Sequence, residues 1–187
     1  LLAESRIDLP EGLPPMAAGT FGYMGYDTVR LIEKLPEMGP DALGVPDAIL
    51  IRPTLMVVFD SVKDEMTVVT PVRPQKGVSA KDAFAAADAR LSAAVASLDA
   101  PLPHQTSAAL GTLELPEPVS NTTPKQYLDM VAKAKEYIKA GDIFQVVLSQ
   151  RFSAPFALPS FALYRALRRL NPSPFLFHLD FGTFSLV

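Results

Sequence analysis

The chain has 187 residues, of which 49% are hydrophobic and 20% are charged. This balance can bury a core and excludes a disordered chain. The net charge is -3 and no basic run is present, which argues against nucleic acid or an acidic membrane as a partner. Cysteine is absent, which excludes disulfides and thiolate metal sites and favours a cytoplasmic location. No apolar run is long enough to span a bilayer.

The two ends of the sequence predict an internal piece of a longer protein. The chain starts at Leu1 rather than Met, and it ends with Phe184-Ser185-Leu186-Val187 inside what is predicted as a strand. A strand that stops in mid-pattern needs a pairing partner, which we expect beyond Val187.

Short elements are predicted in the first half of the chain. Gly19, Gly22 and Gly25, spaced among aromatic residues, indicate a strand over 17–23 whose backbone approaches a neighbour closely. A short helix is predicted over 27–35.

We expect Asp27 to cap that short helix. Apolar runs then predict a strand at 49–51 and a hairpin of 55–59 with 66–72, turning at 61–64. The first hairpin strand is nearly all apolar, which predicts burial on both faces.

An alanine-rich helix is predicted over 79–98, with Ser79 as its cap. Its apolar stripe consists of Phe84, Ala87, Leu91, Ala94, Val95 and Leu98. Residues 99–122 are rich in Pro and small polar residues and predict a linker, in which His104 is an exposed histidine without a metal-ligand neighbour.

The stretch from 123 to 152 has the clearest pattern. Thr123 and Gln126 have capping-box spacing around Pro124, and Gly141 is typical of a left-handed helix end, so a helix is predicted over 123–140. Its apolar stripe consists of Tyr127, Met130, Val131, Ala134, Tyr137 and Ile138.

A strand is predicted after this helix. One face, from Phe144 to Phe152, is mostly apolar and predicts core contact; the other face contains Gln145, Ser149 and Arg151. The polar face is consistent with solvent or with a cavity for a polar ligand, and the alternation does not choose between them.

The last part predicts a helix over 160–170, ended by Asn171 in a left-handed conformation, and then a strand, a turn at 180–183 and a returning strand. The expected buried face of the helix consists of Leu163, Tyr164, Leu167 and Leu170. We expect His178 to be a hydrogen-bonded structural residue rather than a base. No complete catalytic motif is present, and the residues by themselves indicate an α+β protein.

Three motifs nevertheless resemble anthranilate synthase component I, a family of chorismate-binding enzymes. The run G-D-I-F-Q-V-V-L-S-Q-R-F at 141–152 resembles the opening of that family's chorismate-binding domain. N-P-S-P-F-L-F-H at 171–178 resembles its N-P-S-P-Y-M-F-Y stretch, and G-T-F-G-Y-M-G-Y-D at 19–27 resembles its N-terminal domain.

The resemblance implies a partial copy of the family's α+β fold, with mostly antiparallel sheets packed with helices in two layers. Residues 1–98 would be the later part of the N-terminal regulatory domain, 99–122 a linker, and 123–187 the beginning of the catalytic domain. The implied reaction aminates chorismate and eliminates pyruvate to give anthranilate, a lyase reaction of tryptophan biosynthesis. It uses Mg²⁺, ammonia from a glutamine amidotransferase subunit or fused domain, and feedback inhibition by tryptophan.

The resemblance also implies roles for several residues. Gln145 matches a lysine that activates water in the related isochorismate synthases; an amide has no titrating group, so we assign Gln145 to the active-site wall. The polar strand face, with Ser149 and Arg151, would then face chorismate. The feedback tryptophan site would include Asn171, Pro172, Ser173, Pro174, Phe175 and Leu176.

Other family features are expected outside this sequence. The glycine-serine-proline-glutamate segment, the acidic Mg²⁺ ligands, the catalytic histidine and the chorismate loop should follow Val187, which leaves no metal ligand here and predicts that residues 1–187 alone are inactive. Leu1–Ser5 resembles the other half of the tryptophan site but lies too close to the 19–27 run, so we interpret it as a coincidence. Two alternatives stay open: aminodeoxychorismate synthase component I, or a non-catalytic module that binds tryptophan or a partner.

Overall fold

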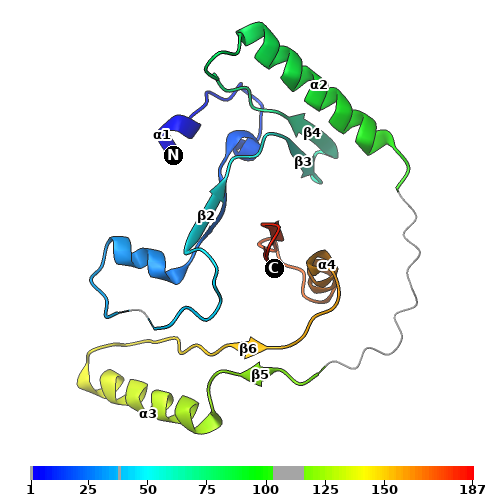
Figure 1. The fold of residues 1–187 in the computed structure, drawn as a ribbon. Helices are drawn as coiled ribbons and strands as arrows, with labels where there is room; N and C mark the ends of the chain where they lie inside the picture. Colours follow the sequence, from blue (N-terminus) through cyan, green and yellow to red (C-terminus); the bar gives the residue numbers. More distant parts are fainter. Residues whose placement is uncertain (1, 38, 103–115) are drawn as a thin grey trace. The chain divides into compact units, whose positions relative to one another are not determined.

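A computed structural model describes residues 2–37, 39–102 and 116–187. The chain forms two compact units, Leu1–His104 and Gln105–Val187 (Figure 1). The boundary lies inside the range 99–122. Because 103–115, including His104, lie outside the described residues, the linker and domain assignments stay predictions.

Unit 1 begins with short elements: α1 (Leu2–Ser5), the 3-10 helix η1 (Pro15–Ala18), β1 (Phe21–Met24), the 3-10 helix η2 (Tyr26–Leu31) and β2 (Ala48–Ile51). The strands β1 and β2 pair antiparallel, with Gly22 opposite Leu50. A Cβ on Gly22 would lie 1.8 Å from the carbonyl oxygen of Ile49, and one on Gly25 would lie 3.0 Å from that of Asp47. The predicted close approach of the glycine strand is confirmed, but the strand begins at Phe21 rather than at residue 17, because Pro15–Ala18 forms η1.

The helix predicted over 27–35 is shorter and tighter than expected. The 3-10 helix η2 starts after Gly25, and Asp27 does not cap it. The Asp27 carboxylate instead pairs with Arg30, with 2.7 Å between Oδ1 and Nε. The helix ends at Leu31, four residues before the residue that Pro36 restricts, so the proline is not what ends it.

The predicted hairpin is present as β3 (Met56–Asp60) and β4 (Glu65–Val69). In its turn, Oδ1 of Asp60 accepts hydrogen bonds from the backbone N–H of Val62 at 2.9 Å and of Lys63 at 3.1 Å. The prediction of a strand buried on both faces is wrong, because Phe59 is 72% exposed. A sheet of only two strands is too narrow to bury the side chains on both of its faces.

Helix α2 (Ala80–Asp99) packs beside β4 (Figure 1). The predicted cap is confirmed, since the Ser79 side chain accepts from the Asp82 N–H. Ala87 is buried, but Phe84 of the predicted apolar stripe is 69% exposed. The stripe is therefore only partly covered within the described residues.

Unit 2 contains β5 (Val119–Ser120), α3 (Pro124–Ala140), β6 (Phe152–Ser153), α4 (Ser160–Leu170), β7 (Leu179–Asp180) and β8 (Ser185–Leu186). The predicted capping box of α3 is complete: Oγ1 of Thr123 accepts from the Gln126 N–H, and the Gln126 side chain accepts from the Thr123 N–H. Gly141 ends the helix at φ 84°, as predicted. The Asp142 N–H closes the end on the Tyr137 carbonyl at 3.0 Å.

The second helix of unit 2 has the predicted bounds, but two details differ. None of the four residues of the predicted buried face is buried, since Leu163 is 40% and Leu170 83% exposed and Tyr164 and Leu167 are half-buried, and Asn171 has φ -140° rather than a left-handed angle. Its N–H continues the helical ladder by donating to the Leu167 carbonyl at 2.8 Å, so the helix ends without a left-handed residue. The strands after it form the hairpin β7–β8, with Leu179 opposite Leu186.

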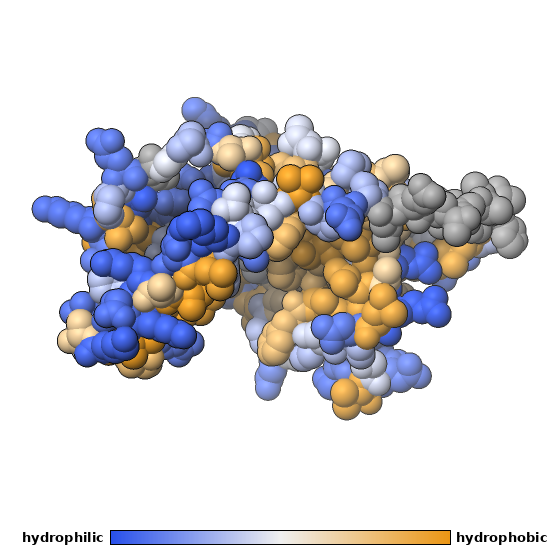
Figure 2. Space-filling model, turned by 90° about the horizontal axis from the view of Figure 1, so that it is seen from below, coloured by the Kyte–Doolittle hydropathy of each residue, from blue (hydrophilic) through white to orange (hydrophobic). Residues whose placement is uncertain are grey.

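All four sheets in the described residues are antiparallel pairs, and together with the helices they confirm the α+β class. Among the described residues, Ala17, Ala87, Ala134 and Ser5 are buried, and no large side chain is fully buried. Hydrophobic residues are exposed at the surface on the face of the molecule shown in Figure 2. The described residues thus lack much of the burial expected of a self-contained fold.

Candidate functional site

The segment from α3 to β6 contains the residues predicted to line the active site. It runs in extended form, but only Phe152 and Ser153 at its end pair with another strand in the described residues, namely β5. The prediction of a strand over 143–152 is therefore wrong for most of its length. A strand is defined by its ladder, and in residues 116–187 the short β5 offers two residues for pairing.

The two faces of this segment differ less than predicted. Gln145 and Ser149 are exposed, in line with a polar surface. Phe144, which we expected in the core, is 94% exposed, and Val147 on the polar face is 83% exposed. Because apolar side chains are exposed on both faces, we expect another part of a folded protein to pack against this segment.

The end of the segment is fixed by a reciprocal pair of hydrogen bonds. The Arg151 N–H donates to Oδ1 of Asn121, and the Asn121 N–H donates to the Arg151 carbonyl, both at 2.9 Å. Next to this pair, Ser120 Oγ donates to Oε1 of Gln150 at 3.2 Å. Sequence reasoning missed Asn121 because it lay in the predicted linker, although an Asx side chain just before a helix cap is a recognisable turn signal.

The guanidinium of Arg151 has one feature of a binding group. Its Nε is shielded from solvent and has no hydrogen-bond partner among the described residues. An unpaired buried donor costs about 1–3 kcal/mol, so native proteins normally supply it with a partner.

The residues predicted for a tryptophan site lie together in a turn after α4. The Phe175 N–H donates to Oγ of Ser173 at 3.3 Å, and the Leu176 N–H donates to the Ser173 carbonyl at 3.4 Å. Asn171, Pro172 and Pro174, like Phe175, are exposed, and Leu176 is half-buried. Phe175 is 85% exposed, which leaves an aromatic face open to a ligand or to another segment.

The turn is held by a polar and aromatic contact between α4 and the β7–β8 hairpin. Oγ of Ser160 lies 2.9 Å from Nε2 of His178 and donates to Oγ of Ser185 at 3.1 Å. The rings of Phe161 and His178 meet edge to face at 5.4 Å. The prediction of a hydrogen-bonded histidine is confirmed.

These two groups of residues are not joined by a direct interaction. In the described part of unit 2, no hydrogen bond or ring contact links Gln145 or Ser149 to the turn at 171–176. Among the described residues, no group of three or more acidic or histidine side chains could hold a metal ion. The described side chains therefore do not form a Mg²⁺ site by themselves.

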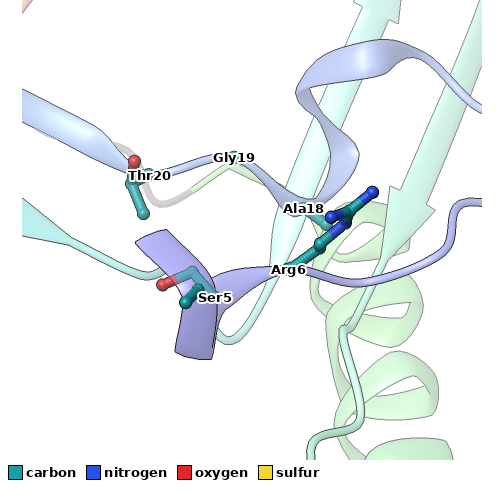
Figure 3. A pocket seen from close by; sticks show the side chains of 6 residues that line it. Ser5, Arg6, Ala18, Gly19 and Thr20 are labelled. Atoms are coloured by element: carbon teal, nitrogen blue, oxygen red, sulfur yellow. The ribbon is translucent and has the colours of Figure 1, made fainter. Parts of the chain in front are cut away.

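Unit 1 has a cavity of about 430 Å³ between α1 and the start of the glycine strand. Ser5, which is buried, and Arg6 lie across from Ala18, Gly19 and Thr20 (Figure 3). The cavity includes part of the Leu1–Ser5 stretch. That the resemblance of this stretch to a tryptophan site is a coincidence stays a prediction.

Comparison with known proteins adds what the geometry lacks. The model of the chorismate binding enzyme family matches residues 2–187. This chain belongs to the chorismate-binding enzyme family. Anthranilate synthase component 1 of Cereibacter sphaeroides is 52% identical over 188 residues, covering 100% of this chain and 37% of the relative. The Thermus thermophilus protein of that name is 42% identical over 175 residues, covering 94% and 36%.

A solved structure gives the same assignment. The crystal structure of anthranilate synthase component I from Streptococcus pneumoniae TIGR4 matches with a TM-score of 0.75 and 32% identity. The match covers 89% of this chain and 37% of that one. The prediction of a partial copy of this fold is confirmed, and the chain spans 37% of the length of its Cereibacter sphaeroides relative.

Within the described ranges, none of the helices combines the length and the hydropathy that a membrane span needs.

Proposed function

We propose that residues 1–187 belong to the large subunit of an anthranilate synthase, which aminates chorismate with ammonia and eliminates pyruvate. The observation that carries this proposal is the 52% identity, over the whole chain, to a protein named anthranilate synthase component 1. The open apolar surface supports the view that these residues fold against further parts of a longer polypeptide.

In this proposal, the extended segment after α3 forms one wall of the chorismate site. Gln145 supplies a neutral amide that can donate and accept hydrogen bonds but cannot act as a base. Ammonia, already a nucleophile, needs no water-activating amine at this position. Ser149 contributes a hydroxyl, and the unpaired Nε of Arg151 contributes a donor for an oxygen of the completed site.

We assign feedback inhibition by tryptophan to the turn at 171–176. The support is its geometry, because the exposed Phe175 ring offers a flat apolar surface against which an indole can stack. The hydrogen bonds from Phe175 and Leu176 to Ser173 hold this turn in shape.

The remaining parts of the reaction lie outside these residues. We propose that acidic side chains beyond Val187 hold Mg²⁺, which would bind and polarise oxygens of chorismate, and that a glutamine amidotransferase subunit or domain supplies ammonia. A cytoplasmic location fits the absence of cysteine.

The test uses the longest natural polypeptide that contains residues 1–187, supplied with chorismate, Mg²⁺ and an ammonium salt. We expect Gln145→Ala to lower kcat/KM for chorismate about tenfold, the effect of losing one hydrogen bond. Gln150→Ala is the matched control, because Gln150 has the same amide but lies on the other face and contacts Ser120. Equal effects of both changes would contradict the assignment of Gln145.

A further inference from the structure

Unit 1 contains a second cavity, of about 390 Å³, between α2 and the chain on either side of the β3–β4 hairpin. Three arginines from three separate segments line it: Arg52 after β2, Arg73 after β4, and Arg90 on α2. Gathering three like charges in a chain whose net charge is -3 costs repulsion unless an anion offsets it.

The arginines are not neutralised by the protein residues described. The ion pairs among the described residues involve Arg30, Lys125 and Lys139, and none of the three cavity arginines. The one carboxylate in the described lining, Asp82, accepts a hydrogen bond from Ser79 Oγ at 2.6 Å as part of the α2 cap. The lining therefore has an excess of positive charge.

Arg73 provides the second, independent observation. Its Nε and Nη2 are shielded from water and have no hydrogen-bond partner among the described residues. These are the two donors that a guanidinium uses to bind a carboxylate or phosphate in bidentate fashion. Unpaired and buried, they destabilise the present arrangement, and rotation of the flexible side chain would bring them to an anion in the cavity.

Arg90 is already oriented for such a role. Its Nε donates to Oγ1 of Thr70 at 3.1 Å, and this hydroxyl in turn donates to the Thr54 carbonyl at 2.7 Å. This chain of hydrogen bonds leaves the other guanidinium nitrogens of Arg90 available to bind a ligand. Pro71, Val72 and Val78 add apolar contacts to the lining.

We propose that this arginine cavity, defined by Arg52, Arg73 and Arg90, binds a small anion with a phosphate or carboxylate group. The volume suits a small molecule. The proposal is independent of the chorismate reaction, since all three arginines belong to unit 1 and none of the residues assigned to chorismate does.

The test is calorimetric titration of the longest natural polypeptide containing residues 1–187 with inorganic phosphate and, separately, with malonate. We expect saturable binding of at least one probe that weakens with added salt; phosphate alone or malonate alone identifies the preferred group. Arg73→Gln should weaken binding about tenfold or more, while Lys81→Gln, the same charge change at an exposed α2 residue outside the cavity, should change it less than about twofold.

If Arg73→Gln does not fold, Arg90→Gln serves as the second variant, with an expected loss of several-fold. The proposal is overturned if the unaltered protein binds neither probe. It is also overturned if the arginine and lysine variants bind equally well.

Discussion

Replacing Gly22 by alanine tests the most crowded backbone contact in unit 1. The new Cβ would lie 1.8 Å from the carbonyl oxygen and 2.8 Å from the carbonyl carbon of Ile49, and both atoms are backbone. Neither can rotate away, so β1 and β2 must move apart or the ladder between them must break. The glycine also has φ 153°, which L residues rarely adopt.

The expected loss follows from these two causes. Backbone strain contributes about 1–3 kcal/mol, and weakening one or two ladder hydrogen bonds contributes about 1 kcal/mol each. The sum is about 2–5 kcal/mol, which lowers Tm by roughly 4–20 °C at the roughly 2–4 °C per kcal/mol that is typical of domains of about 150–250 residues.

Thermal unfolding of the longest natural polypeptide containing these residues measures this loss. Gly39→Ala is the matched control, because a Cβ there meets nothing within 4 Å. Its Tm should stay unchanged or rise slightly, since alanine restricts the unfolded chain. Equal Tm values for the two variants would refute the close approach of β1 and β2.

Three further predictions concern other elements. Thr123→Ala removes the α3 cap and should cost about 1 kcal/mol, seen as faster amide exchange in the first turn of the helix; Lys125→Ala should leave that exchange nearly unchanged. The pKa of Asp60 should lie below its ordinary value of 3.8, because the backbone N–H groups of Lys63 and Val62 stabilise the carboxylate. The carboxylate therefore stabilises the hairpin turn above pH 3.8, and this stabilisation is lost as the pH falls through the lowered pKa. An NMR titration that gives a pKa of 3.8 or more would contradict this prediction. Ser160→Ala removes the hydroxyl that is hydrogen-bonded to His178 and should destabilise unit 2 by about 1 kcal/mol in urea unfolding, whereas an unchanged midpoint would show that this contact is not formed.

The sequence predicted best those elements whose causes are local. Both ends of α3 depend on residues within one helical turn, Thr123 with Gln126 and then Gly141, so the pattern alone identified them. The crowding at Gly22 was also predicted, because a glycine among bulky residues in a strand often marks a place where another backbone comes close.

The errors arose where structure depends on distant partners. The sequence over 143–152 alternates as a strand would, but a strand requires a neighbour to pair with, and the described residues supply one only for Phe152 and the following Ser153. Phe59 and Phe144 were placed in a core by their apolar character, which indicates that a residue can be buried but not what covers it.

The functional residues were identified by resemblance rather than by physical pattern. The residues next to Gln145, Ser149 and Phe175 in the sequence form no catalytic or metal-binding motif that would identify a site in an unfamiliar sequence. The arginine cavity shows the opposite case, since Arg52, Arg73 and Arg90 are far apart in the sequence and converge only in the fold.

The most direct measurement identifies the product that the longest natural polypeptide containing residues 1–187 forms from chorismate in the presence of Mg²⁺ and an ammonium salt. The product is detected by the fluorescence of anthranilate and by chromatography. We predict anthranilate and pyruvate in equal amounts, inhibition by tryptophan that Phe175→Ala weakens, and no product from residues 1–187 alone. Aminodeoxychorismate as the product, or no consumption of chorismate by the longer polypeptide, would contradict this prediction.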